Sequence, residues 1–438
     1  MDLRAENQKL REENQKFREE NQSLKNQLNS QTSHFPSSKT IIKPIVSLRE
    51  PSGKKSGGQL GRLGTTLERS SNPDEIIDYK PPTCLQCGNN LAEERMELSA
   101  SRQVFDIPPI PRQICTEHRV YQVKCSCGHM AEGQFPPYVT APVQYGVNTT
   151  AMVSYLSTFQ YLPYKRLCEL MKITYGIDFS EGSVENLLKK SVSYLQPIYN
   201  QINERLVQSK VVGGDETGLS INGQKGWMFG FQTPKLTYLK ASLTRGFSTI
   251  SDTFANGFPH SIYVSDCLPM QLKVEARKHQ ICLAHLLREV KGFIKGHEEK
   301  EWSPKFYALL CEAYELKKQA FICPQRIKTC EQSLENLLLH SPTNNNKIQA
   351  FVKRLKKNRS AIFTFLYHKD VPPDNNGTER VIRNVKVKMK VSGFFKSFDG
   401  AQNFAVIRSV VDTILKNNQN LFDIFAQIHK CNYQLVSE

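Results

Sequence analysis

Long apolar runs are absent from this sequence of 438 residues. No stretch is hydrophobic enough to span a bilayer. The N-terminus is polar and charged, without the apolar core of a secretory signal peptide. These absences argue against a membrane protein and against a secreted one. We therefore expect a cytoplasmic protein that has no membrane partner.

Acidic residues are scarce relative to basic ones, since 42 Asp and Glu face 58 Lys and Arg, for a formal net charge of +16. This surplus favours a polyanionic partner, with nucleic acid first. A basic protein without such a partner is the alternative, so the positions of the basic residues must decide. The hydrophobic content of 39% and the chain length suit two or three globular domains with at least one sizeable core.

The first 31 residues repeat with a period of seven, as in "ENQKLRE" and "ENQKFRE". One heptad position holds Leu3, Leu10, Phe17 and Leu24, and the neighbouring seam position holds Asn7, Asn14, Asn21 and Leu28. This pattern predicts a short coiled coil over residues 1–31 whose buried asparagines restrict register. It implies a homo-oligomer, at least a dimer. A solvated single helix is the alternative.

The next segments differ sharply in composition. Residues 32–80 are rich in Ser, Lys, Gly and Pro and predict a flexible basic linker. Residues 81–135 carry two cysteine pairs. Residues 146–210 have helical periodicity with a turn at Gly176, which suits either a DNA-binding helix-turn-helix or an ordinary helical hairpin.

From residue 211 the pattern becomes strand-like. The runs "KVVGGD", "GWMFGFQT", "LTYLKAS", "SIYVSD" and "HQICLA" predict five strands, the first three in a meander. A helix is expected near 246–257, and Leu- and Lys-rich helical material fills 285–368. After the turn "VPPDNNG" the chain is expected to be helical through most of 378–430.

Two close cysteine pairs, "CLQCG" and "CSCG", indicate a metal site. In a cytosolic chain, paired cysteines serve metal binding more often than disulfides, and Zn²⁺ takes four thiolates in a tetrahedron. We expect a structural zinc site formed by Cys84, Cys87, Cys125 and Cys127. Cys115 or His118 can replace one ligand, and unliganded thiols are the alternative.

Three acids stand at positions that suit catalysis. Asp215 is predicted to end the first strand and Asp266 the fourth, and these strands are neighbours in a ribonuclease-H-like sheet. Glu379 begins a later helix. Three carboxylates from separate elements can hold two Mg²⁺ ions for an in-line phosphoryl displacement. The glycines before Asp215 are expected to admit a nucleic-acid backbone, whereas Glu216 is expected to face the other side of the strand.

With these motifs in order, the chain resembles the insertion-sequence 66 family of bacterial DDE transposases over nearly its whole length. The resemblance rests on "GDETG", "VSDC", "CLAHLLREV", "DNNGTER" and "KVSGFFKSFDGAQNFAVIRSVVDT". It implies the DDE roles for Asp215, Asp266 and Glu379, and the zinc roles for the four cysteines. Cys282 and His285 match a C-x-x-H motif, for which we expect a structural hydrogen bond near the metal site ahead of a second metal site.

The chain departs from the family pattern at three places. The second cysteine pair is C-x-C, with one intervening residue rather than two, and Leu283 stands where the C-x-x-H motif usually has an aromatic residue. The basic run after Glu379 differs in detail. If that run were extended, its alternate lysines would share one face. The expected DNA contacts are Lys165, Arg166, Arg380, Arg383, Lys386, Lys388 and Lys390.

The sequence thus predicts an α+β multidomain protein with a coiled coil (1–31), a linker (32–80), a zinc-binding segment (81–135), a helical DNA-binding domain (146–210) and a ribonuclease-H-like catalytic domain (211–430) with a helical insertion at about 286–368. The expected function is DNA transposition with two Mg²⁺ ions, or Mn²⁺ in their place, and structural Zn²⁺. Its partners would be the terminal repeats of the element, target DNA and accessory proteins of the same element, and DNA binding would place it at the bacterial nucleoid. The alternatives are a ribonuclease-H-like nuclease that does not join strands and a non-catalytic zinc-dependent DNA-binding protein.

Overall fold

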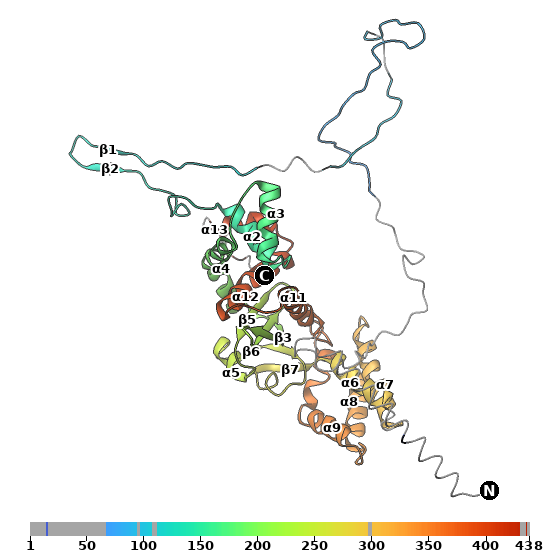
Figure 1. The fold of residues 1–438 in the computed structure, drawn as a ribbon. Helices are drawn as coiled ribbons and strands as arrows, with labels where there is room; N and C mark the ends of the chain where they lie inside the picture. The colour runs from blue at the N-terminus through green and yellow to red at the C-terminus, as the bar shows by residue number, and fades with distance from the viewer. Residues whose placement is uncertain are drawn as a thin grey trace. The chain divides into compact units, whose positions relative to one another are not determined.

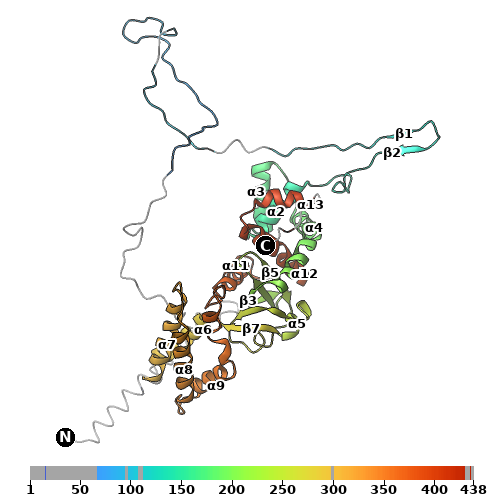
Figure 2. The same cartoon turned by 180° about the vertical axis from the view of Figure 1, so that it is seen from behind.

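The structure is a computed structural model that describes residues 15, 67–93, 97–106, 112–296, 300–429 and 435 (Figures 1 and 2). The coiled coil expected over residues 1–31 lies outside the described residues, apart from Gln15, which is helical. Most of the linker expected over residues 32–80 also lies outside them. Its described part, residues 67–80, contains no helix or strand.

The described chain contains two β-sheets. The smaller one pairs β1 (Gln122–Lys124) with β2 (Met130–Glu132) in antiparallel register. The larger one has the strand order β5-β4-β3-β6-β7. Its strands are β3 (Val211–Ile221), β4 (Gln224–Gln232), β5 (Thr237–Ser242), β6 (Phe258–Ser265) and β7 (Ala276–Ile281). The first three form the expected antiparallel meander, and β6 and β7 run parallel to β3.

Side-chain alternation gives this sheet two apolar faces. Val212 and Phe229 belong to one buried cluster, whereas Leu219, Ile221 and Met228 belong to another. Because successive strand residues point to opposite faces, odd-numbered positions of β3 lie on the face of the second cluster. Asp215 therefore shares its face with Leu219 and Ile221.

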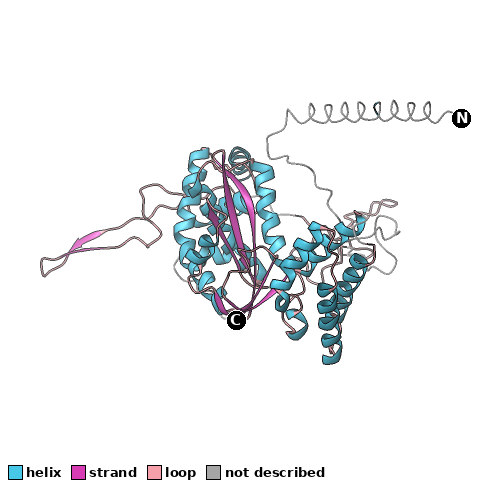
Figure 3. Ribbon diagram, turned by 90° about the horizontal axis from the view of Figure 1, so that it is seen from below, coloured by secondary structure: helices cyan, strands magenta, loops and turns pink. Residues whose placement is uncertain are grey.

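Helices cover both faces (Figure 3). The cluster of Val212 also contains residues of α4 (Glu181–Gln208), α5 (Phe247–Thr253), α12 (Phe398–Lys416) and α13 (Leu421–His429). The cluster of Leu219 contains residues of α11 (Asn376–Ser392) and the start of α12. Within the part of the chain described here, no helix has both the length and the apolar character needed to cross a membrane.

The helix α12 also closes the open edge of the sheet at β5. The backbone N–H groups of Thr237 and Leu239 donate to the hydroxyls of Thr413 and Ser409, at 3.1 and 2.8 Å. An edge strand with unpaired amides is a template for pairing with another chain. Hydroxyls from a covering helix satisfy these amides and protect this edge.

Helices α2 (Val147–Thr158) and α3 (Tyr164–Tyr175) belong with α4 to the same cluster as the sheet. Arg408 of α12 strengthens this contact, since its Nη1 donates to the Tyr161 hydroxyl at 2.9 Å and its guanidinium lies over the Phe159 ring. The division expected between residues 210 and 211 therefore runs through one continuous hydrophobic cluster. The helical segment is a layer of the core.

The helical insertion starts directly after β7 and ends before α11. It comprises α6 (Leu283–Lys295), α7 (Trp302–Lys317), α8 (Pro324–Leu339), α9 (Asn346–Lys357), a 3-10 turn (Arg359–Ala361) and α10 (Thr364–Tyr367). Lys317 joins the end of α7 to the segment around α10, because its Nζ donates to the carbonyls of Phe365, His368 and Lys369 at 2.8–2.9 Å.

Candidate active site

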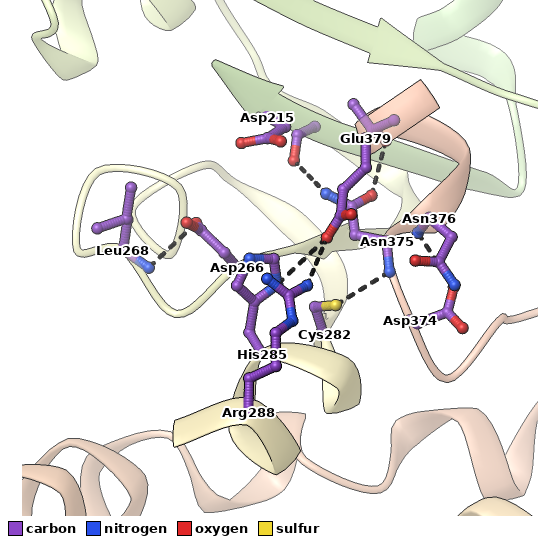
Figure 4. Close-up of polar contacts among 12 residues, drawn as sticks. Asp215, Asp266, Leu268, Cys282, His285, Arg288, Asp374, Asn375, Asn376 and Glu379 are labelled. Atoms are coloured by element: carbon purple, nitrogen blue, oxygen red, sulfur yellow. Dashed lines mark hydrogen bonds and ion pairs between the residues drawn. The ribbon is translucent and has the colours of Figure 1, made fainter. Parts of the chain in front are cut away.

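The three expected acids come from three parts of the chain: β3, the residue after β6, and α11 (Figure 4). Asp266 directly follows β6, and Glu379 lies in the first turn of α11. Asp215 does not end its strand, as the sequence suggested, because β3 continues to Ile221. What ends near Asp215 is the parallel pairing with β6, whose last pair is Gly213 with Val264. The antiparallel partner β4 carries β3 onward.

The two glycines before Asp215 are required by the protein itself. A Cβ on Gly213 would lie 2.3 Å from the Thr378 hydroxyl, and one on Gly214 would lie 1.8 Å from the Tyr263 hydroxyl. Thr378 belongs to α11 and Tyr263 to β6. The expectation that these glycines admit a DNA backbone is therefore wrong. Protein side chains occupy the space on both faces, and this close approach brings α11 onto the sheet.

Asp215 and Asp266 are largely buried and have no cationic side chain in ion-pair contact among the described residues. Burial, and then the charge of Asp266, raise the pKa of Asp215 to about 7. Burial, and then the charge of Glu216, raise the pKa of Asp266 to about 6. Their hydrogen bonds come from backbone N–H groups: Glu216 to Asp215 at 2.8 Å and Leu268 to Asp266 at 3.3 Å. This pair of carboxylates therefore favours a bound cation.

Glu216 has the opposite environment. Its side chain is 1% exposed, and Arg245 donates to its Oε1 from Nη2 at 2.8 Å and from Nε at 3.0 Å. Gln271 donates to Oε2 at 2.6 Å. These partners satisfy the charge of Glu216 within the protein. Glu216 is thus a structural carboxylate next to Asp215.

Glu379 points toward the C-x-x-H motif (Figure 4). Its Oε1 lies 2.8 Å from Arg288 Nη2 and 3.7 Å from His285 Nδ1. Among the described residues, the one group of three or more potential ligands whose atoms lie within 4.8 Å of one another is Cys282, His285 and Glu379. Burial lowers the pKa of His285 and raises that of Cys282 to about 11.

Sequence reasoning missed Asn375, a buried residue that connects the backbones carrying the three acids. Its N–H donates to Cys282 Sγ at 3.1 Å, and its Nδ2 donates to the Gly214 carbonyl at 2.8 Å. Its Oδ1 accepts from the Thr378 hydroxyl at 2.6 Å, and its carbonyl accepts from the Glu379 N–H at 3.0 Å. The Cys282 N–H in turn donates to the Ser265 carbonyl at 2.7 Å. The available signal was its position four residues before Glu379, in a stretch interpreted only as a turn.

Comparison with protein families identifies the chain. A model of the family described as "Transposase IS66 family" matches residues 142–403, more than half of the chain. The chain belongs to this transposase family. A search of curated proteins finds none that matches it. The match covers the helices α2–α4, the five-stranded sheet and all three acids.

A DDE-type transposase family implies the use of a divalent metal ion. The residues fit that requirement, since Asp215 and Asp266 supply hard oxygen ligands where burial, and then nearby negative charge, raise their pKa values. Glu379 lies beside them on α11, although its carboxylate contacts Arg288. Asp215, Asp266 and Glu379 do not form one of the described groups whose ligand atoms all lie within 4.8 Å of one another. The fit to Mg²⁺ therefore rests on the two largely buried carboxylates, whose charge no cationic side chain of the described residues pairs with.

The four cysteines expected to bind zinc lie outside the region of the family match. Cys84 and Cys87 occupy one turn, and Cys125 and Cys127 follow β1 in another. The N–H of Cys87 is the main cause that lowers the pKa of Cys84, and the N–H of Cys127 does the same for Cys125. In the described chain the four thiols do not come together as one group. Each turn is shaped to stabilise a thiolate, and zinc binding stays a prediction.

Most of the basic residues expected to contact DNA are exposed in this family member. Lys165 and Arg166 lie in the first turn of α3, and Arg380, Arg383, Lys386 and Lys390 lie along α11. The idea of an extended run is wrong because residues 376–392 are helical. A helix rotates about 100° per residue, so Lys388 faces away from its neighbours. It is buried, and burial lowers its pKa to about 8.

Proposed function

We propose that the chain is a DDE transposase that binds the ends of its mobile element, hydrolyses a phosphodiester bond and joins the freed 3′-hydroxyl to target DNA. The observation that carries this proposal is the position of Asp215, Asp266 and Glu379 on β3, after β6 and on α11. The strand order β5-β4-β3-β6-β7 supports a ribonuclease-H-like core. The membership in the IS66 family supports the same chemistry.

In this proposal Asp215, Asp266 and Glu379 hold divalent ions. When bound, these ions supply charge stabilisation to both the attacking and the leaving oxygen of the phosphodiester. The chain positions the DNA: Arg383 and Lys386 project from α11 beyond Glu379 and would bind the phosphates next to the cleaved bond. The hydrogen bonds of Asn375 to Gly214 and Thr378 would hold Glu379 on α11 in a fixed position relative to Asp215 on β3.

The proposal extends to the parts outside the core. The turns with Cys84, Cys87, Cys125 and Cys127 would form a structural zinc site, and α3 with Lys165 and Arg166 would contact the terminal repeats. The heptad repeat in residues 1–31 would pair two protomers, and therefore two DNA ends. Accessory proteins of the same element would be further partners.

The test uses the full chain and a labelled duplex that carries the end of the element. Wild-type protein with Mg²⁺ should nick the duplex at the end and join it to a second DNA, whereas Asp215→Asn and Glu379→Gln should give neither product. Nicking without joining would identify a nuclease instead. Binding by all three proteins without any Mg²⁺-dependent product would point to a DNA-binding protein.

A further inference from the structure

We propose that Cys282, His285 and Glu379 form a site for a thiophilic divalent ion such as Zn²⁺, which withdraws Glu379 from the Mg²⁺ site and so inhibits catalysis. The binding half of this proposal stands on the geometry alone. The inhibitory half rests on the proposed function, in which Glu379 serves together with Asp215 and Asp266.

The three ligand atoms are already close to the separation that zinc requires. They lie within 4.8 Å of one another, and His285 Nδ1 and Glu379 Oε1 are 3.7 Å apart. In a tetrahedral site with bonds of about 2.0–2.3 Å, the ligand atoms are roughly 3.3–3.8 Å apart. Ligand-atom displacements of a few tenths of an ångström to about one ångström therefore bring the three side chains to zinc-binding distances. The fourth position is left to water or to another ligand.

The backbone that carries the ligands is held in place. Cys282 caps the N-terminus of α6, and His285 follows one turn later on the same face. Glu379 comes from the first turn of α11. The N–H of Leu283 donates to the Pro373 carbonyl at 2.8 Å, which joins the start of α6 to the segment before α11. The backbone positions of the three ligands are therefore set before an ion binds.

The surroundings of the sulfur suit a metal-bound thiolate. The Asn375 N–H points at Cys282 Sγ from 3.1 Å, and the N-terminus of α6 places further partial positive charge beside it. Both features stabilise negative charge on sulfur and offset part of the burial that raises the pKa of Cys282, and a coordinating ion would displace the thiol proton. A hydrogen bond to the thiolate from outside the ligand set also orients it toward the ion.

His285 supplies the second, independent observation. Its Nδ1 is buried and has no hydrogen-bond partner in the described structure. Glu379 Oε1 lies 3.7 Å from this nitrogen, beyond hydrogen-bond distance. A buried ring nitrogen without a partner costs free energy, and an ion between the imidazole and the carboxylate would satisfy both groups.

Arg288 occupies the competing position. Its guanidinium pairs with Glu379 Oε1 at 2.8 Å, and its side chain is 36% exposed, so it can move toward solvent when an ion replaces it. Mg²⁺ prefers oxygen ligands and would not compete well for a thiolate and an imidazole. The two sites therefore differ in the metal they select, and Glu379 is the residue they share.

Metal content tests the binding half. The full-length protein, loaded with Zn²⁺ and dialysed, should hold one zinc more than Cys282→Ser or His285→Gln. Cys330→Ser is the matched control, because Cys330 is a buried thiol of α8 outside the cluster. Co²⁺ in place of Zn²⁺ should give a thiolate-to-cobalt absorption band whose intensity drops in Cys282→Ser and not in Cys330→Ser. Equal zinc content in all four proteins would overturn the proposal.

A Zn²⁺ titration of the nicking reaction at fixed Mg²⁺ tests the inhibitory half. The Zn²⁺ concentration for half inhibition should rise by more than about tenfold in His285→Gln, measured relative to the uninhibited rate of that variant. Equal sensitivity of wild type and variant would overturn it. A wild type that binds the extra zinc but never nicks DNA would instead defeat the proposed function, with the metal site intact.

Discussion

Asp215 and Glu216 are adjacent in β3, yet their carboxylates lie in opposite environments. Glu216 is fully buried and satisfied by Arg245 and Gln271. Asp215 lies on the face of α11, where its one hydrogen-bond donor among the described residues is a backbone N–H, and its pKa is raised to about 7. A carboxylate whose charge is paired within the protein stabilises the fold. An unpaired carboxylate beside a second one destabilises the fold in the absence of a cation, and such a pair is a candidate functional site.

The largest expected effect separates the two residues by activity. Asp215→Asn should lower the rate of Mg²⁺-dependent nicking by at least about 10²–10³-fold, because it removes charge from the proposed metal site. Glu216→Gln should change the rate of the folded protein far less, because its carboxylate points to the other face. A single-turnover assay on the labelled duplex measures both. Equal losses of nicking rate in the two variants would show that Asp215 and Glu216 do not differ in role.

Stability should respond in the reverse order. Glu216→Gln removes the charge that Arg245 pairs with and should lower the free energy of unfolding by about 2–3 kcal/mol. Glu185→Gln is the control, because Glu185 forms a solvent-exposed pair with Lys189 whose loss should cost far less stability. Urea denaturation measures both. A cost no larger for Glu216→Gln than for Glu185→Gln would show that burial adds nothing to the pair.

Asn375 tests whether the site depends on the connection between α11 and β3. Asn375→Ala loses the hydrogen bonds of its side chain to Gly214 and Thr378 and should cost about 1–3 kcal/mol of stability. It should also raise the Mg²⁺ concentration needed for half-maximal nicking. The exposed neighbour gives a control, Asn376→Ala. An unchanged Mg²⁺ requirement at reduced stability would reveal a purely structural residue.

The last expected effect is a pH dependence of stability. The pKa values of Asp215 and Asp266 rise from 3.8 to about 7 and about 6 on folding, so the folded chain binds more protons than the unfolded chain between these limits. Their contribution to stability is therefore fully present below pH 4 and is lost as the pH rises through 6 and 7. Without Mg²⁺, Asp215→Asn should flatten the decline in stability between pH 5.5 and 7.5. An identical slope in wild type and variant would contradict these pKa values.

Local pattern was enough to locate much of this site. β-branched runs located the strands, and the expected neighbours β3 and β6 are paired. The alternation rule predicted the separate environment of Glu216. The helix at Glu379 was also expected. These features depend on residues close in sequence or on a common strand order.

Other features depend on contacts between distant segments, which the pattern does not contain. Positions 213 and 214 must be glycine because Thr378 and Tyr263 leave no room for a Cβ atom there. Asn375 donates to a carbonyl 161 residues away. Lys388 resembled its exposed neighbours in the sequence, and only the rotation of α11 buries it. In each case the decisive partner belongs to another element.

The hydrophobic cluster that joins α2–α4 to the sheet determines which fragments of this protein can fold. A fragment that begins at residue 211 would keep every acid, yet it would expose Val212, Phe229 and Phe231, which are buried in a cluster shared with α2–α4. Such a fragment should aggregate, since large exposed apolar patches promote association. The smallest soluble piece with an intact candidate site should begin before α2, and the DNA-binding surface proposed for α3 would then belong to the same packed core as the acids.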